Sequence, residues 1–145
     1  MPNVRGCNLP EDRLYDVDNH TWFTEEGDGT VKIGMTAIAT AMAGQLVAFT
    51  PKKVGRKVRP GRSCATVESG KWVGPAKSAA GGEVIAVNDD MLSNPSMANE
   101  DPYSAWMVQL KPDDWDSAKG SLTAGSDVAG PYEAKMDSEG FEGCG

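Results

Sequence analysis

A lysine follows a glycine in the run Val67-Glu68-Ser69-Gly70-Lys71-Trp72-Val73, which lies between two β-rich stretches of the chain. Residues 64–67 form the first stretch, and the second leads toward residues 81–87. Glycine in a short connection between such stretches marks a tight turn, so the pattern predicts a β-hairpin with Lys71 at its tip. The amine would be exposed there and accessible to an acylating partner enzyme. We interpret Lys71 as the attachment point of a mobile prosthetic group.

A free lysine amine transfers no electrons and carries no acyl group reversibly under mild conditions. Lipoic acid attached covalently to Lys71 would add a dithiolane, which performs redox and group-transfer chemistry while the protein supplies position and recognition. Gly70 is expected to take the positive φ that a tight turn requires. Glu68 and Ser69 lie where the lipoate-attaching enzyme would read them. A simpler alternative is a lysine that only solubilises the turn, because turns commonly carry lysine.

The overall composition indicates a small soluble domain rich in strands. At 145 residues the chain is long enough for one domain with a real core. Its aromatic content of 7%, with 17 glycines and 9 prolines, indicates many short strands and turns. The net charge of −7 argues against a phosphate-binding surface. It suits either docking on basic patches of partner proteins or plain solubility.

Nucleic acid and membranes are not expected partners. Residues 52–62 form a basic loop, but no aromatic residue is interleaved there for base stacking, so we interpret it as a solvated loop. No apolar run approaches the roughly 20 residues that span a bilayer, and residues 1–5 lack a signal-peptide core. We therefore expect a cytoplasmic monomer.

Three segments are expected along the chain. Residues 1–13 form a polar, loosely attached lead, residues 14–119 form the carrier domain, and residues 120–145 form a flexible acidic tail. Within the domain, Thr36 is placed to cap a short helix that ends at Gly44. Strands are predicted at 21–24, 31–33, 46–49, 64–69, 72–74, 83–87 and 106–110, and a short helix near Trp115 is capped by Asp113 or Asp114.

Single residues that could do other chemistry each have a structural alternative. His20 is the only histidine, which favours a structural role beside Trp22 over a role as metal ligand or base. The odd count of three cysteines without CxxC spacing indicates neither a disulfide framework nor a zinc site. Cys64 is expected to be a buried small hydrophobe. Cys7 and Cys144 could form a disulfide or accept sulfur, and an inert exposed thiol is the preferred interpretation.

Five motifs in order and at matching spacing resemble the H protein of the glycine cleavage system and its lipoate-binding relatives. The similarity extends over residues 20–110 and rests on His20-Thr21-Trp22, Val31-Lys32-Ile33-Gly34-Met35-Thr36, Val67-Glu68-Ser69-Gly70-Lys71, Gly82-Glu83-Val84-Ile85-Ala86-Val87-Asn88 and Asn99-Glu100-Asp101-Pro102-Tyr103. The resemblance implies a mainly β, flattened hybrid sandwich of two antiparallel sheets with small helices, like lipoyl and biotinyl carriers. It also implies a non-catalytic carrier with lipoic acid on Lys71.

Departures from the family pattern bear on the cargo. Gly70 and Trp72 flank Lys71 where the family has valine and alanine, and residues 79–82 replace the family's P-V-S-G. With the terminal cysteines, these traits resemble the lipoate-binding proteins of heterodisulfide-reductase-like sulfur oxidation, which implies a carrier of sulfur intermediates for that complex. The alternative is a glycine cleavage H protein that carries an aminomethyl group between the glycine cleavage enzymes. A biotin carrier is disfavoured, because Gly70 and Trp72 replace the methionines that flank a biotinyl lysine.

Overall fold

Seven strands form the larger sheet of the computed structural model, which describes residues 3–144. All neighbouring strands in this sheet are antiparallel, and their order is β12-β3-β4-β5-β11-β10-β7. The strands are β3 (Leu14–Asp16), β4 (Thr21–Glu25), β5 (Val31–Met35), β7 (Lys57–Val58), β10 (Gly82–Val87), β11 (Trp106–Pro112) and β12 (Thr123–Ala124). The second sheet contains β6 (Leu46–Pro51), β8 (Arg62–Ser69) and β9 (Val73–Ser78), with β8 in the middle.

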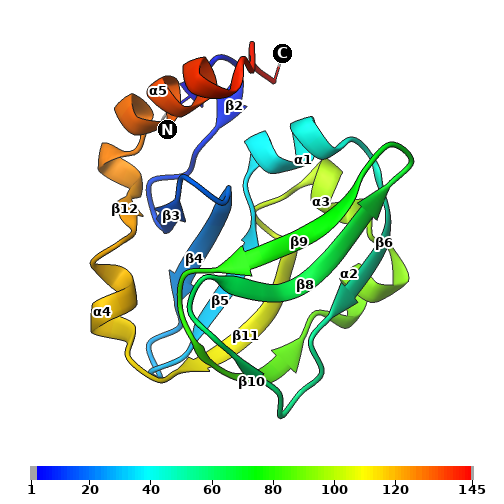
Figure 1. The fold of residues 1–145 in the computed structure, drawn as a ribbon, viewed down its shortest axis with the longest axis vertical. Helices are drawn as coiled ribbons and strands as arrows, with labels where there is room; N and C mark the ends of the chain where they lie inside the picture. The colour runs from blue at the N-terminus through cyan, green and yellow to red at the C-terminus, as the bar shows by residue number, and fades with distance from the viewer. Residues whose placement is uncertain (1–2, 145) are drawn as a thin grey trace.

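The core lies between these two sheets (Figure 1). Alternate residues of β5 are buried at Val31, Ile33 and Met35, as expected for a strand with one face toward the core. From β8 and β11, Val67 and Leu110 join the same cluster. The predicted class, a mainly β sandwich of two antiparallel sheets with small helices, is confirmed.

The helices are short, and the first one occupies a central place. α1 (Ala37–Ala43) begins at Thr36, whose side chain accepts a hydrogen bond from Ala39 N, and ends at Gly44 with φ +84°, as the sequence predicts. It lies between the β8–β9 turn and the end of the chain (Figure 1). The other helices are α2 (Asp89–Ser93), α3 (Met97–Glu100), α4 (Trp115–Lys119, capped by Asp114), the 3-10 turn η1 (Gly125–Asp127) and α5 (Ala129–Glu139). Within residues 3–144, none of these helices combines the length and apolar character of a membrane span.

The two ends of the chain correct the predicted segments. Residues 1, 2 and 145 lie outside the described part, but the rest of the expected lead and tail packs against the domain. β1 (Asn3–Val4) and β2 (Cys7–Asn8) form a hairpin, and α5 buries Tyr132 and Met136 in the same small cluster as Cys7. The prediction of a flexible tail is therefore wrong for the residues of α5. Its few apolar residues lie four apart on one helix face, where they outweigh the polar composition.

Candidate functional site

Lys71 lies at the tip of the β8–β9 hairpin, where the sequence places it. The two strands pair as far as Glu68 and Val73, which leaves the four-residue turn Ser69–Trp72. Ser69 N donates a hydrogen bond to Trp72 O at 2.7 Å, and Lys71 N donates one to Ser69 Oγ at 3.3 Å. These bonds fix the backbone of the turn, while the Lys71 side chain stays exposed.

The three residues before Lys71 differ in what they do. Glu68 is exposed on β8, whereas Ser69 is 5% exposed and holds the turn through its backbone and hydroxyl. Gly70 does not have a positive φ, and a Cβ added there would meet no atom within 4 Å. The expectation that Gly70 supplies a left-handed turn residue is wrong, because the four-residue loop closes without one.

The Lys71 side chain extends across the end of α1. A Cβ placed on Gly44 would lie 2.9 Å from Lys71 Cε, so the glycine leaves the space that this side chain occupies. Within residues 3–144, Lys71 Nζ has neither a hydrogen-bond acceptor nor a carboxylate partner. The amine is therefore accessible and uncommitted, as an acylation site must be.

An apolar cleft of about 480 Å³ opens beside Lys71, within the size range of small-molecule sites. It is lined by Asn19, His20, Thr21, Met35, Ala39, Met42, Ala43, Val67, Lys71, Trp72, Pro75 and Ala76, none of which is acidic. Trp72 forms part of the wall and folds back over Gly74, where a Cβ would lie 2.4 Å from the indole. A free amine beside an apolar cleft fits a lipoyl group, because such walls can cover its hydrocarbon chain.

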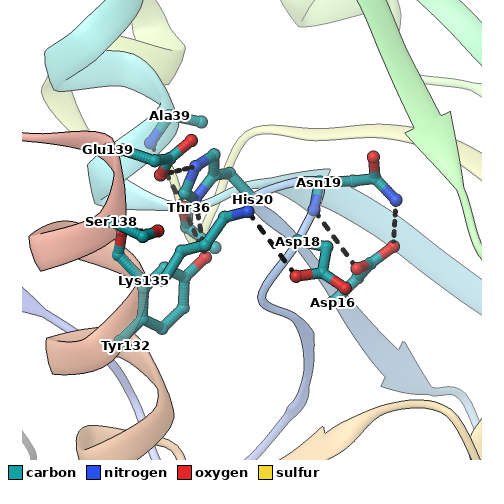
Figure 2. A network of polar contacts seen from close by, with 10 residues as sticks. All are labelled: Asp16, Asp18, Asn19, His20, Thr36, Ala39, Tyr132, Lys135, Ser138 and Glu139. Atoms are coloured by element: carbon teal, nitrogen blue, oxygen red, sulfur yellow. Dashed lines mark hydrogen bonds and ion pairs between the residues drawn. The ribbon is translucent and has the colours of Figure 1, made fainter.

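His20 closes one side of this cleft and is held there by α5. Its Nδ1 lies 3.2 Å from the Tyr132 hydroxyl, and its Nε2 lies 2.9 Å from Glu139 Oε1 (Figure 2). The ring stacks on Tyr132 at 5.7 Å, and the backbone has φ +57°. Burial lowers the pKa of His20, although Glu139 acts in the opposite direction. These contacts agree with a structural role for His20, which joins α5 to the wall of the cleft.

The cysteines divide into one buried thiol and one disulfide. Cys64 is fully buried, and burial raises the pKa of its thiol to about 12, as expected for a small core residue. Cys7 and Cys144 form a disulfide across 137 residues of sequence. The preference for inert exposed thiols is wrong, because the β1–β2 hairpin and the end of α5 lie together. In the sequence, the only indication of this disulfide is that Cys7 and Cys144 lie near opposite ends of the chain.

A basic groove of about 550 Å³ lies at the opposite end of the β8–β9 hairpin from Lys71. Its cationic lining residues are Lys52, Lys57, Arg59, Arg62 and Lys77. Lys57 pairs with Asp113 at 2.7 Å. Among residues 3–144, no cluster of histidine, cysteine and acidic side chains is suited to a metal ion. Lys71 beside the apolar cleft is therefore the candidate site that we consider further.

Comparison with known proteins shows the family of the chain. The profile of the family described as glycine cleavage H-protein matches residues 14–134. Glycine cleavage system H protein 5 of Aquifex aeolicus is 45% identical over the full length of both chains, and a probable glycine cleavage system H protein 2 of Sulfurisphaera tokodaii is 40% identical over 89% of each chain. A crystal structure of a glycine cleavage system H protein from Mycobacterium marinum superposes with a TM-score of 0.73 at 30% identity, covering 91% of this chain and 99% of the other. This chain therefore belongs to the glycine cleavage H-protein family, whose members are non-catalytic carriers with lipoic acid attached covalently to a lysine.

Proposed function

We propose that Lys71 is the lipoylated residue and that the protein serves as a lipoyl carrier of the glycine cleavage type. The observation that carries this proposal is the uncommitted Lys71 amine at a hydrogen-bonded hairpin tip, next to an apolar cleft. Membership of the family, and the 45% identity to a glycine cleavage H protein over the whole chain, support an aminomethyl group as the cargo of the lipoyl arm.

The residues of this chain divide the work of such a carrier. Lipoic acid supplies reversible thiol–disulfide and group-transfer chemistry through its dithiolane. Lys71 Nζ holds it by an amide, which removes the ammonium charge and lowers the hydration of the tip. Ser69 keeps the turn in one conformation, and Gly44 leaves room for the lysine stem. The apolar side chains of the cleft exclude water beside the attachment point.

Recognition by other proteins is assigned to the surface around the turn. Glu68 and Gly70 are exposed next to Lys71 and would contact the lipoate-attaching enzyme. The net charge of −7 favours partners with basic surfaces, such as the glycine cleavage enzymes. Raised ionic strength should weaken these encounters by screening.

Intact-mass analysis tests the attachment site. Protein produced with lipoate and a competent ligase should carry one lipoyl group, and Lys71→Arg should carry none. Lys77→Arg is the matched control, because Lys77 is an exposed lysine on the same hairpin and its loss should leave modification complete. An unmodified parent protein, or a modified Lys71→Arg variant, would contradict the proposal.

A second cargo, sulfur intermediates of a heterodisulfide-reductase-like pathway, is favoured by the charge of the cleft. An ammonium cargo held beside apolar walls needs a carboxylate partner, and the cleft lining contains none. H proteins 2, 3 and 5 of Aquifex aeolicus are all similar to this chain, so one organism holds several proteins of this family. Lipoylated protein incubated with glycine and glycine cleavage enzymes, or with a persulfide donor, should gain mass from only one of the two.

A further inference from the structure

The Cys7–Cys144 disulfide and Lys71 lie at the two ends of α1. At the first turn of the helix, Cys144 Sγ lies 3.7 Å from Ala37 O. At the last turn, the Lys71 side chain crosses Gly44. The seven residues of α1 span only about 10 Å. A lysine side chain extended by the octanoic chain of lipoic acid is longer than this helix.

Two surface hollows line the route between these ends. One, of about 390 Å³, is lined by Lys71 and Gly44 among others. The other, of about 220 Å³, is lined by Cys144, Ala37, Thr40, Ala41 and Asn99 among others. They meet at one hydrogen bond, since Asn99 Nδ2 donates to Gly44 O at 2.9 Å.

The face of α1 along this route carries only small side chains. Ala37, Thr40, Ala41 and Gly44 are spaced three and four residues apart, which places them on one side of the helix. Of the larger residues of α1, Met42 lines the apolar cleft and Ile38 is buried in the core cluster that contains Cys7. The path from Lys71 to Cys144 is therefore not blocked by the helix that separates them.

We propose that the Cys7–Cys144 disulfide is an internal redox partner of the lipoyl group on Lys71, an inference that rests on the proposed function. In the exchange, the reduced dithiol loses two electrons and two protons and closes to the dithiolane. The bond between Cys7 and Cys144 breaks, and the two sulfurs receive those electrons and protons as thiols. Cys144 is the sulfur open to attack, because it is partly exposed while Cys7 is buried.

A chain of polar contacts through α5 connects the disulfide to His20 in the wall of the cleft. Cys144 N donates to Arg5 O at 2.9 Å, and the Arg5 guanidinium binds Glu133 and Asp137 on α5. The same helix supplies Glu139 to His20. Opening the disulfide removes the covalent tie between the chain ends beside this network. The redox state of the lipoyl group would thereby change how firmly α5 is held against the rest of the domain.

The test follows the two cysteines directly in lipoylated, full-length protein. Dihydrolipoyl dehydrogenase with NADH reduces the lipoyl group, samples are quenched in acid, unfolded and alkylated, and peptides with Cys7 and Cys144 are quantified by mass spectrometry. Both should become alkylated in the parent protein and remain a disulfide in Lys71→Arg under the same conditions. Cys64, labelled after unfolding in every sample, reports complete alkylation.

A matched pair of α1 variants tests the route. Ala41→Leu places a larger side chain in the hollow beside Cys144 and should slow the exchange several-fold, whereas Met42→Leu on the cleft side should not. The rate should not depend on protein concentration if the exchange is intramolecular. A fully lipoylated and reduced protein whose disulfide stays closed overturns the inference and leaves the carrier function intact. Absence of lipoate on Lys71 overturns both.

Discussion

Lys71 Cε lies so close to Gly44 that a Cβ on this glycine would approach it to 2.9 Å. The contact joins two elements that are distant in sequence, the hairpin turn and the C-terminal cap of α1. Gly44 serves both, because its φ of +84° ends the helix and its missing side chain leaves room for the lysine stem. The Lys71 side chain is thus positioned by α1 as well as by its own turn.

Replacing Gly44 by alanine should affect both roles. Gly44 has φ +84° and ψ −174°, a backbone region that is essentially restricted to glycine and costs another residue about 1–3 kcal/mol. Urea unfolding of Gly44→Ala should therefore show a loss of that size. Displacement of the Lys71 stem should also slow lipoate attachment, measured by intact mass against time. Gly70→Ala is the control, since position 70 has open space and no positive φ. Equal behaviour of the two variants would contradict the role given to Gly44.

Trp72 is expected to shield the lipoyl group rather than stabilise the fold. The indole is 42% exposed and forms part of the cleft wall, so Trp72→Ala should change the free energy of unfolding by no more than about 0.5–1 kcal/mol. Reduction of the lipoyl group by a small soluble thiol should become several-fold faster, measured by thiol titration. Val73→Ala, which alters an exposed neighbour outside the cleft, should leave that rate unchanged.

The sequence predicts the parts of this fold whose signals are local. The Thr36 and Gly44 caps, the strand at residues 31–33 and the turn at Lys71 each depend on neighbouring residues, and the structure confirms them. The cleft could not be predicted, because it forms where β4, α1 and the β8–β9 hairpin meet across the sandwich. The positive φ expected of Gly70 is absent, because the residue types at a turn do not specify the length of the loop that closes the hairpin.

The predictions for the two chain ends are wrong for a different reason. The hydrophobic residues of α5 are few and spaced by polar ones, so average composition predicts disorder where a single buried face stabilises a helix. The disulfide depends on the same docking, because Cys7 and Cys144 meet only when α5 lies beside the β1–β2 hairpin. Its formation is a consequence of tertiary structure.

Tyr132 should be the residue that holds α5 in place. Its side chain is fully buried, its ring packs against Tyr15 and His20, and its hydroxyl lies 3.4 Å from Thr36 Oγ1. Tyr132→Ala should lower the free energy of unfolding by about 3–5 kcal/mol, as for other large core aromatics. Ser138→Ala, at an exposed position of the same helix, should change it little. Urea unfolding of both variants measures the difference. If Tyr132→Ala unfolds at the same urea concentration as the parent protein, α5 contributes little to stability, as the predicted flexible tail implies.

The buried position of His20 should make stability depend on pH just below neutrality. Because burial lowers the pKa of His20 from its ordinary 6.5, the unfolded chain binds a proton more readily than the folded protein in this range. The free energy of unfolding should therefore fall as pH drops through about 6.5 toward the folded pKa, by at most about 1.4 kcal/mol per pH unit. Acidic groups whose pKa is lowered, such as Glu25, lose their contribution only below about 4.5.

Two variants separate His20 from those carboxylates. His20→Asn should remove the dependence between pH 7 and 5, and asparagine tolerates the positive φ of this position. Glu139→Gln should make the dependence steeper, because the Glu139 carboxylate favours the protonated imidazole more than Asp16 does. Urea unfolding at pH 7, 6 and 5 measures all three proteins. A parent protein that gains stability on acidification over this range would show that the Glu139 pair outweighs burial, and that protonation of His20 strengthens the contact between α5 and the cleft.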